Sequence, residues 1–259
     1  MNLQGAGVVV TGAGSGIGRA LAVTAAERGA RVVVSDLDAT AAGQVAEQVG
    51  GLAVPGDLGT PDFPARLVEA GQDELGANDL FLSNAGVDVG KGPDPGDDAW
   101  TTALDVNLLA HVRLTRALLP GWVEAGRGHL VVTASAAGLL TMIGNAPYSV
   151  SKHAAVALAE WLAIEHGDQG VTVQALCPQG VNTRMLQEAG SARGLLSQDG
   201  ALEPDDVARL TLDSLDSGEF LILPHPAVGD YYRARAEDTD RWLAGMRRLR
   251  RRTLGPEAT

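Results

Sequence analysis

The sequence contains a single cysteine, Cys177, so the chain cannot form an internal disulfide. The absence of disulfides is typical of reducing compartments, and we therefore expect a cytoplasmic location. The five histidines show none of the spacings that are typical of metal ligands. We therefore expect no metal site.

Positive charge is also scarce. Lys and Arg total 20 against 32 Asp and Glu, which gives a net charge of −12. Nucleic acids and anionic membranes select basic surfaces, so we expect neither as a partner and favour a small-molecule substrate. Residues 130–151 carry no charge, but polar residues, Gly and Pro interrupt them, which favours a buried strand and loop over a membrane span. The first residues lack the basic flank and apolar stretch of a secretory signal peptide.

Short apolar segments alternate with longer helical patterns along a chain of 259 residues, a length typical of one α/β domain. Seven segments rich in Val and Leu predict strands, at residues 7–12, 30–36, 51–57, 79–86, 129–135, 171–178 and 219–224. The segments between them are long enough for crossover helices, at 16–29, 39–49, 61–76, 98–125, 147–167 and 204–217. This alternation predicts a single-domain, doubly wound parallel sheet of the Rossmann type over residues 1–224, with ligands at the carboxyl ends of the strands.

A glycine-rich segment, TGAGSGIGRA, follows the first predicted strand and begins a predicted helix. Its glycines at positions 12, 16 and 18 permit a tight turn and let a pyrophosphate approach the backbone N–H groups at the start of the helix. Strand, loop and helix occur in the order that dinucleotide binding requires. We therefore predict a dinucleotide site with contacts from Gly12, Ser15, Gly16, Ile17 and Gly18.

Asp36 ends the second predicted strand, 24 residues after Gly12. A carboxylate there accepts hydrogen bonds from the adenosine ribose hydroxyls and repels a 2′-phosphate, so we expect NAD rather than NADP. Arg19 is the nearby residue that would favour a phosphate instead. Further cofactor contacts are expected after the second, third and fourth strands, from Leu37, Asp57, Leu58, Asn84, Ala85 and Gly86.

Lysine occurs only twice, as Lys91 and Lys152, although the chain has 18 arginines. Lys152 follows Tyr148 by four residues on a predicted helix, so the two side chains share one face. A tyrosine that acts as a base near neutral pH needs its pKa lowered from ~10 by roughly 3 units. An ammonium at about 4 Å supplies that much, about 4 kcal/mol at an effective dielectric near 20. Lysine also fits beside a phenol and ribose hydroxyls better than the wide guanidinium of arginine.

Two further polar residues are candidates for the same chemistry. Ser135 ends the fifth predicted strand, thirteen residues before Tyr148, where its hydroxyl can donate to a substrate carbonyl. Asn107 lies within the predicted helix at 98–125, where it can bond the backbone and position a water that relays protons from Lys152. A purely structural Asn107 is the alternative, since buried polar groups need partners.

The motifs together resemble those of the classical short-chain dehydrogenase/reductases over residues 5–224. This family has a sheet of order 3-2-1-4-5-6-7, a TGxxxGxG loop, an NAG triplet and an Asn-Ser-Tyr-Lys tetrad. The resemblance implies that Tyr148 is the acid/base, Ser135 orients substrate, Lys152 lowers the tyrosine pKa and holds the ribose, and Asn107 anchors a proton relay. It also implies a homo-oligomer, dimer or tetramer, and further cofactor contacts from Pro178, Val181 and Thr183.

The segments around Tyr148 predict a largely apolar substrate site. Its expected lining residues are Leu139, Leu140, Met142 and Ile143, with Asn145 and Gln179 as polar contacts and Met185 from a lid at residues 184–203. Gln179 stands where the family commonly has glycine. We therefore expect an uncharged, fairly hydrophobic secondary alcohol or ketone as substrate, interconverted with NAD as cofactor.

Residues 225–259 form an extension with apolar residues spaced as in an amphipathic helix, followed by a basic tail. We expect this helix to pack on the lid or on a neighbouring subunit, and its final arginines to stay solvated at the helix C-terminus. Two other functions remain open from sequence. One is a 3-oxoacyl thioester reductase, and the other is a non-catalytic NAD(H)-sensing protein.

Overall fold

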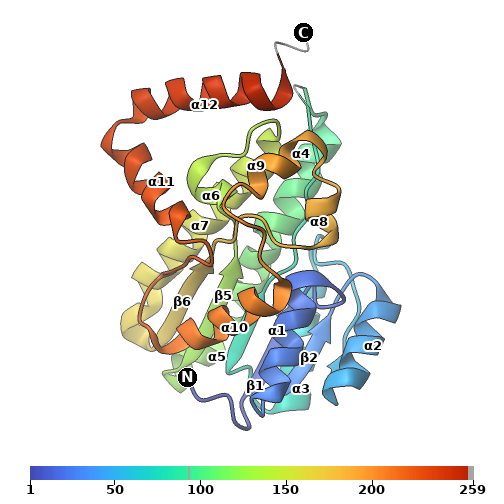
Figure 1. Ribbon diagram of the computed structural model, residues 1–259. Coiled ribbons are helices and arrows are strands. Elements are labelled where there is room, and N and C mark those ends of the chain that lie inside the picture. The colour runs from blue at the N-terminus through green and yellow to red at the C-terminus, as the bar shows by residue number, and fades with distance from the viewer. Residues whose placement is uncertain (93, 256–259) are drawn as a thin grey trace.

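The computed structural model describes residues 1–92 and 94–255, so the last residues of the predicted basic tail, 256–259, lie outside the described residues. Its centre is a parallel sheet of order β3-β2-β1-β4-β5-β6-β7 (Figure 1). The strands are β1 (Gly7–Thr11), β2 (Arg31–Ser35), β3 (Leu52–Ala53), β4 (Leu80–Ser83), β5 (Gly128–Thr133), β6 (Val171–Leu176) and β7 (Leu221–Ile222). The predicted doubly wound α/β fold is confirmed.

The two edge strands, β3 and β7, are shorter than the sequence predicts. In the region of β3, the N–H groups of Val54 and Gly56 still donate to the β2 side, to the carbonyl oxygens of Val34 and Asp36 at 2.8 and 3.0 Å. Pro55 lies between them, and its nitrogen faces away from β2, so its missing N–H is tolerated on this edge strand and the bonds to β2 continue past the assigned strand. The chain remains extended, which carries Asp57 to the same edge of the sheet as Asp36.

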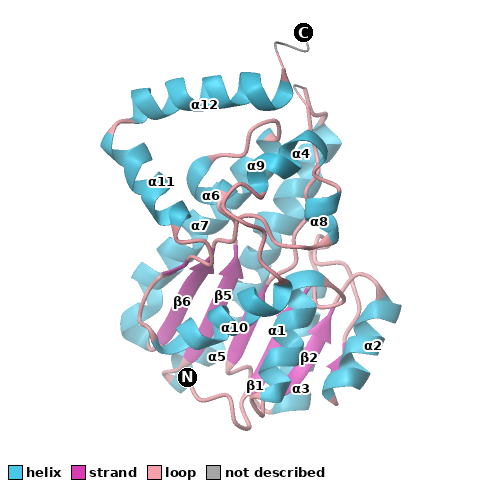
Figure 2. Ribbon diagram, viewed as in Figure 1, coloured by secondary structure: helices cyan, strands magenta, loops and turns pink. Residues whose placement is uncertain are grey.

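Helices cover both faces of the sheet (Figure 2). Alternating side chains build the two cores: Val9 and Phe81 pack on one face, and Val8 and Leu82 on the other. The first face carries α3 (Phe63–Leu75), α5 (Ala110–Ala125) and α7 (Ala146–His166), and the second carries α1 (Gly16–Glu27), α2 (Ala39–Val49) and α10 (Pro204–Asp213). Among the described residues, none of the helices has the length and apolar character needed to cross a bilayer.

The helix predicted at 98–125 is interrupted. It consists of α4 (Asp97–Leu104), a π-helical turn (Asp105–Leu109) and α5. A π turn accommodates an extra residue and is frequent at functional sites. Here it contains Asn107, which is fully buried against α7 and the loop after β4. Hydrophobic periodicity does not reveal such an insertion, because the flanking turns keep their helical spacing.

The C-terminal extension forms two helices, α11 (Ala227–Glu237) and α12 (Thr239–Leu254), rather than the single helix expected. Asp238 separates them, and its Oδ1 accepts a hydrogen bond of 2.9 Å from the Arg241 N–H, which caps α12. α11 packs against α6 (Ala137–Leu140), and α12 packs against the lid turn Gly190–Ala192 (Figure 1). The expected contact with the lid is therefore present. The lid itself contains α8 (Arg184–Gln187) and α9 (Arg193–Leu196).

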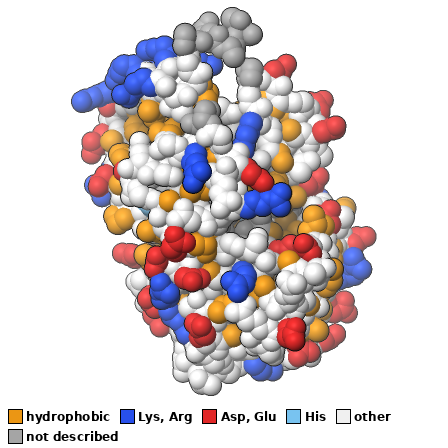
Figure 3. All heavy atoms as spheres, turned by 45° about the vertical axis from the view of Figure 1, so that its right-hand side comes forward, with side chains coloured by type: hydrophobic (Ala, Val, Ile, Leu, Met, Phe, Trp, Pro, Cys, Tyr) orange, Lys and Arg blue, Asp and Glu red, His pale blue; other side chains and the backbone are white. Residues whose placement is uncertain are grey.

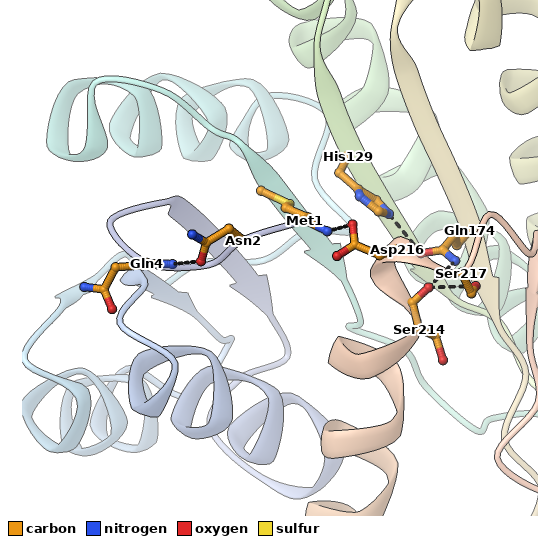
Figure 4. Close-up of polar contacts among 8 residues, drawn as sticks. All are labelled: Met1, Asn2, Gln4, His129, Gln174, Ser214, Asp216 and Ser217. Atoms are coloured by element: carbon orange, nitrogen blue, oxygen red, sulfur yellow. Dashed lines mark hydrogen bonds and ion pairs between the residues drawn. The ribbon is translucent and has the colours of Figure 1, made fainter.

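A polar network joins the start of β5 to the segment that precedes β7 (Figure 4). The His129 Nε2 and Gln174 Oε1 atoms are 2.9 Å apart, and Gln174 Nε2 donates to the carbonyl oxygens of Ser214 and Glu219. The N-terminal ammonium pairs with Asp216 in the same region. These bonds satisfy buried polar groups and hold β7 beside β6.

Candidate functional site

A cavity of about 970 Å³ opens at the carboxyl ends of the strands and extends beneath the lid and α12. Most residues predicted from sequence to form a site line it: Gly12, Ser15, Gly16, Ile17, Gly18, Asp36, Leu37, Asp57, Leu58, Asn84, Ala85, Gly86, Ser135, Leu140, Tyr148, Lys152, Pro178, Gln179, Val181, Thr183 and Met185. Asn107 and Asn145 do not line it, and neither does Leu139, which is buried in the core instead. In the described part of the chain, no group of three or more His, Cys, Asp or Glu side chains is arranged to hold a metal ion.

The glycine-rich loop forms one end of this cavity. A Cβ atom on Gly18 would lie 2.1 Å from the carbonyl oxygen of Gly12, so only glycine lets α1 begin this close to β1. Gly12 has a φ of +61°, and a Cβ there would lie 2.8 Å from the Cα of Ala85. The close approach leaves the N-terminus of α1 directed at the cavity, as an anion such as a pyrophosphate requires.

Thr11 holds the neighbouring loop in place, a role that the sequence analysis missed. Its Oγ1 accepts hydrogen bonds from the N–H groups of Asn84 and Ala85, at 2.9 and 3.0 Å. Asn84 Nδ2 donates in return to the Thr11 carbonyl oxygen at 3.0 Å. These bonds link β1 to the segment after β4, and the threonine before the glycines was the available signal.

Asp36 is oriented by its own loop. Its Oδ2 accepts from the Gly14 N–H at 2.8 Å, and its Oδ1 accepts from the Asp38 N–H at 3.0 Å. Each oxygen keeps a lone pair for a ribose hydroxyl. Arg19, which would favour a 2′-phosphate, donates instead to Gln48 Oε1 at 2.8 Å and does not line the cavity. The environment of Asp36 fits an unphosphorylated ribose.

Lys152 and Asn107 converge on Gly86. A Cβ on Gly86 would lie 3.1 Å from both the Lys152 Nζ and the Asn107 Oδ1. Lys152 donates from Nζ to the carbonyl oxygen of Thr133, at the end of β5, at 2.8 Å. Asn107 bonds both the N–H and the carbonyl oxygen of Val87, at 2.8 and 3.0 Å, and donates to Ser151 Oγ at 3.0 Å. Its side chain therefore positions the loop and α7.

Asn145 has a different place from the one expected. We predicted a substrate contact, but the side chain is 2% exposed and its Oδ1 caps α7 by accepting from the Tyr148 N–H at 3.0 Å. Its Nδ2 donates to Asp88 Oδ1 at 2.6 Å. Asp88 in turn pairs with Lys91 at 3.0 Å. Asn145 is thus a helix cap that sets the position of Tyr148, because a helix N-terminus needs an acceptor for its free N–H groups.

The electrostatics of Tyr148 also differ from expectation. Burial raises the pKa of its phenol to about 12, against an opposing hydrogen bond with Ser135, and the nearby Asp88 carboxylate adds to the rise. Burial also lowers the pKa of Lys152 to about 8. The expected lowering of the tyrosine pKa by Lys152 is therefore wrong for this structure. The ammonium lies 5.9 Å from the centre of the tyrosine ring and binds Thr133, and desolvation is the largest influence on the phenol.

Ser135 and Gln179 are polar residues that line the same cavity as Tyr148. Ser135 Oγ accepts from the Ala137 N–H at 3.1 Å, which leaves its O–H to donate elsewhere. Gln179 Oε1 is buried and has no hydrogen-bond partner among the described residues. A buried carbonyl without a partner fits a ligand N–H such as a carboxamide. Together with the glycine loop and Asp36, these atoms fit a nicotinamide dinucleotide that lies across the strand ends.

The comparisons with known proteins agree with this geometry. The family model described as short chain dehydrogenase matches residues 6–194. The 1-deoxy-11-beta-hydroxypentalenate dehydrogenase of Streptomyces exfoliatus is 38% identical to this chain, over 86% of this chain and 84% of the relative. The cyclohexanol dehydrogenase of Acinetobacter is 32% identical, over 78% of this chain and 84% of the relative. A short-chain dehydrogenase/reductase from Burkholderia phymatum, solved with NAD, superimposes with a TM-score of 0.85 at 30% identity, over 93% of this chain and 96% of the other. The chain belongs to the short-chain dehydrogenase family, and it is an NAD-dependent oxidoreductase.

Proposed function

We propose that the protein interconverts a fairly hydrophobic secondary alcohol and its ketone, with Tyr148 as the general acid/base. One observation carries the proposal: Ser135, Tyr148 and Lys152 line the same cavity as the dinucleotide loop. NAD, when bound, supplies a hydride acceptor with a positively charged ring. Two relatives are named as dehydrogenases of a hydroxypentalenate and of cyclohexanol. These names support a cyclic alcohol or ketone as the substrate.

The chain's own residues divide the remaining work. Ser135 donates its hydroxyl hydrogen to the substrate oxygen and holds it near the Tyr148 hydroxyl. In ketone reduction the phenol donates a proton to that oxygen, and in alcohol oxidation the phenolate accepts it. Lys152 holds its ammonium between Thr133 and Gly86, where it can bind ribose hydroxyls and restore the proton. Asn107 and Asn145 are positioning residues in this scheme, because they bond the loop and the helix that carry the reactive groups.

The test is NAD(H)-dependent turnover of a panel of cyclic and aliphatic alcohols and ketones by wild-type and Tyr148→Phe protein. Loss of the acid/base group should lower kcat by a factor of ~10²–10⁴ while NADH still binds. Tyr232→Phe is the matched control, because this exposed tyrosine on α11 does not line the cavity. Turnover that survives in Tyr148→Phe would exclude the proposed role. NADH binding without turnover of any substrate would favour the sensor alternative, and turnover restricted to acetoacetyl-coenzyme A would favour the thioester reductase.

We also propose that the protein is a homo-oligomer, a dimer or a tetramer. Exposed hydrophobic side chains on the outer sides of α5 and α7 support this proposal: Val123, Val150, Trp161 and Ile164. Exposed apolar surface of this kind is typical of subunit contacts. Sedimentation of the wild-type protein and of Trp161→Glu/Ile164→Glu tests it, and a wild-type monomer would contradict it.

A further inference from the structure

The helix α12 forms the roof of the cavity over the catalytic residues. After β7 the chain runs along α11, which packs on α6, and returns as α12 across the lid turn Gly190–Ala192 (Figure 1). The far end of α12 lies over the loop that precedes Tyr148, where a Cβ added to Gly144 would lie 3.2 Å from Leu254 Cδ1. A ligand between Tyr148 and α12 therefore meets the C-terminal extension directly.

One face of α12 lines the cavity with two kinds of side chain. Trp242, Met246 and Leu249 supply apolar surface. Arg248 follows Arg241 by seven residues, about two helical turns, and Arg252 follows Arg248 by four residues, about one turn. The three side chains therefore lie on the same face. Arg247 and Arg251 belong to the same helix but do not line the cavity.

The space below this roof is apolar. α6 and the following loop contribute Leu140, Met142 and Ile143, and α9 contributes Leu195 and Leu196. Such walls exclude water and favour a bulky hydrocarbon skeleton over a small or highly polar ligand. A ligand that fills this space reaches from Tyr148 to the arginine-bearing face of α12.

The charges at the roof are unbalanced. Six of the 18 arginines of this acidic chain lie in α12, and Arg and Lys side chains gather at this end of the molecule (Figure 3). Of the acidic residues at the roof, Asp238 uses a carboxylate oxygen to cap α12, and Glu237 is at the end of α11. Elsewhere along the cavity, Asp88 pairs with Lys91 and Arg184 pairs with Glu188. Within residues 1–92 and 94–255, Arg241, Arg248 and Arg252 have no acidic partner.

We propose that the substrate is a bulky apolar ketone or alcohol that carries an anionic group at the end remote from the reacting carbon, and that Arg248 and Arg252 bind this group. The inference rests on the proposed function and adds a substrate class to it. A guanidinium presents a planar set of donors that matches a carboxylate or phosphate. Arg241 lies at the opposite end of α12, where Glu237 and Asp238 also line the cavity, so we assign the anion site to Arg248 and Arg252.

The experiment compares matched probes that differ only in charge. The kcat/KM with NADH is measured for 3-(4-oxocyclohexyl)propanoate and for a steroidal keto acid, each against its methyl ester, and for acetoacetyl-coenzyme A. Dissociation constants of each acid and ester are read in parallel from tryptophan fluorescence with Tyr148→Phe protein saturated with NADH, in which turnover is suppressed. The expected result is a preference for acid over ester of about tenfold or more, expressed mainly in KM.

Two double variants separate contact from general electrostatics. In Arg248→Gln/Arg252→Gln the preference for the acid should fall about tenfold, whereas Arg247→Gln/Arg251→Gln removes the same charge from the same helix and should keep it. If Arg248→Gln/Arg252→Gln lowers kcat/KM only for the keto acids, the anionic group is a carboxylate on the hydrocarbon skeleton. If the variant lowers kcat/KM only for acetoacetyl-coenzyme A, the anionic group is a phosphate of the carrier. Equal acid and ester binding in the wild-type protein, or equal effects of the two double variants, would overturn the proposal. Failure of the proposed function is recognised separately, by turnover that persists in Tyr148→Phe.

Discussion

The Nζ of Lys152 donates a hydrogen bond of 2.8 Å to the carbonyl oxygen of Thr133. This bond ties the side chain of α7 to the end of β5 and holds the ammonium beside Gly86, whose missing side chain makes room for it. It also explains why Lys152 does not lower the pKa of Tyr148 in this structure. The ammonium faces a carbonyl and the loop after β4, and the phenol is left buried, with Ser135 and Asp88 nearby.

The lowered pKa of Lys152 predicts a pH dependence of cofactor use. Below a pH of about 8 the side chain is an ammonium, and above it the charge is lost. The kcat/KM for NADH should therefore be level from about pH 6 to 7.5 and fall as the pH rises through the pKa, because the attraction for an anionic cofactor weakens. Tyr148 keeps its proton throughout this range. In Lys152→Arg the kcat/KM for NADH should be lower overall and should no longer fall with rising pH. A wild-type kcat/KM that stays level to about pH 9.5 would contradict the assignment of this fall to Lys152.

Cofactor preference should depend on Asp36. In Asp36→Asn the kcat/KM for NADH should fall about 10- to 100-fold, because a hydrogen bond to a charged acceptor contributes ~1.5–3 kcal/mol. The ratio of NADPH to NADH use should rise, since the repulsion of a 2′-phosphate is removed. Asp38→Asn is the control, because this residue caps α2 two positions away and asparagine caps equally well. An unchanged cofactor ratio in Asp36→Asn would remove Asp36 from the ribose site.

Two glycine substitutions separate a required glycine from an incidental one. Gly18→Ala places a Cβ 2.1 Å from the backbone oxygen of Gly12, so α1 must move away from β1. We expect a lower melting temperature and a large loss of NADH affinity. Gly43→Ala, within α2, meets nothing within 4 Å and should stabilise the protein by ~0.4–1 kcal/mol. Thermal unfolding with and without NADH measures both, and a Gly18→Ala protein that binds NADH with wild-type affinity would contradict the close-approach argument.

The buried His111 should make the protein sensitive to acid. Burial lowers the pKa of its imidazole from 6.5 to about 3, with the nearby Lys152 charge adding to the effect, and its Nδ1 lies 2.6 Å from Ser83 Oγ. Between these two pH values the unfolded chain binds a proton that the folded protein does not bind, so stability falls as the pH decreases. The slope contributed by one such group is at most ~1.4 kcal/mol per pH unit. Urea unfolding at pH 7, 6 and 5 should show a shallower decline for His111→Gln than for the wild type. A variant of the partly exposed His166, His166→Gln, serves as the control, and equal declines in all three proteins would refute the role of His111.

Much of the site was accessible from sequence because its residues follow strands. Apolar runs end at Thr11, Ser35 and Ser83, and parallel strands bring the residues after them to one edge. The four-residue spacing of Tyr148 and Lys152 likewise places both on one face of α7. Asn145 was misassigned because its position before Tyr148 suits a substrate contact and a helix cap equally well, and only the packing of Asp88 against it distinguishes the two.

Local residue patterns were enough to specify the fold, the dinucleotide loop and the identity of the candidate reactive residues, because these depend on short-range spacing and on the ends of strands. Tertiary packing set the rest. Long-range contacts insert the π turn at Asn107, bury Tyr148 enough to raise its pKa, and bring α12 back over the cavity from the far end of the chain. Desolvation and the approach of distant segments are properties of the folded chain, and no local pattern of residues encodes them.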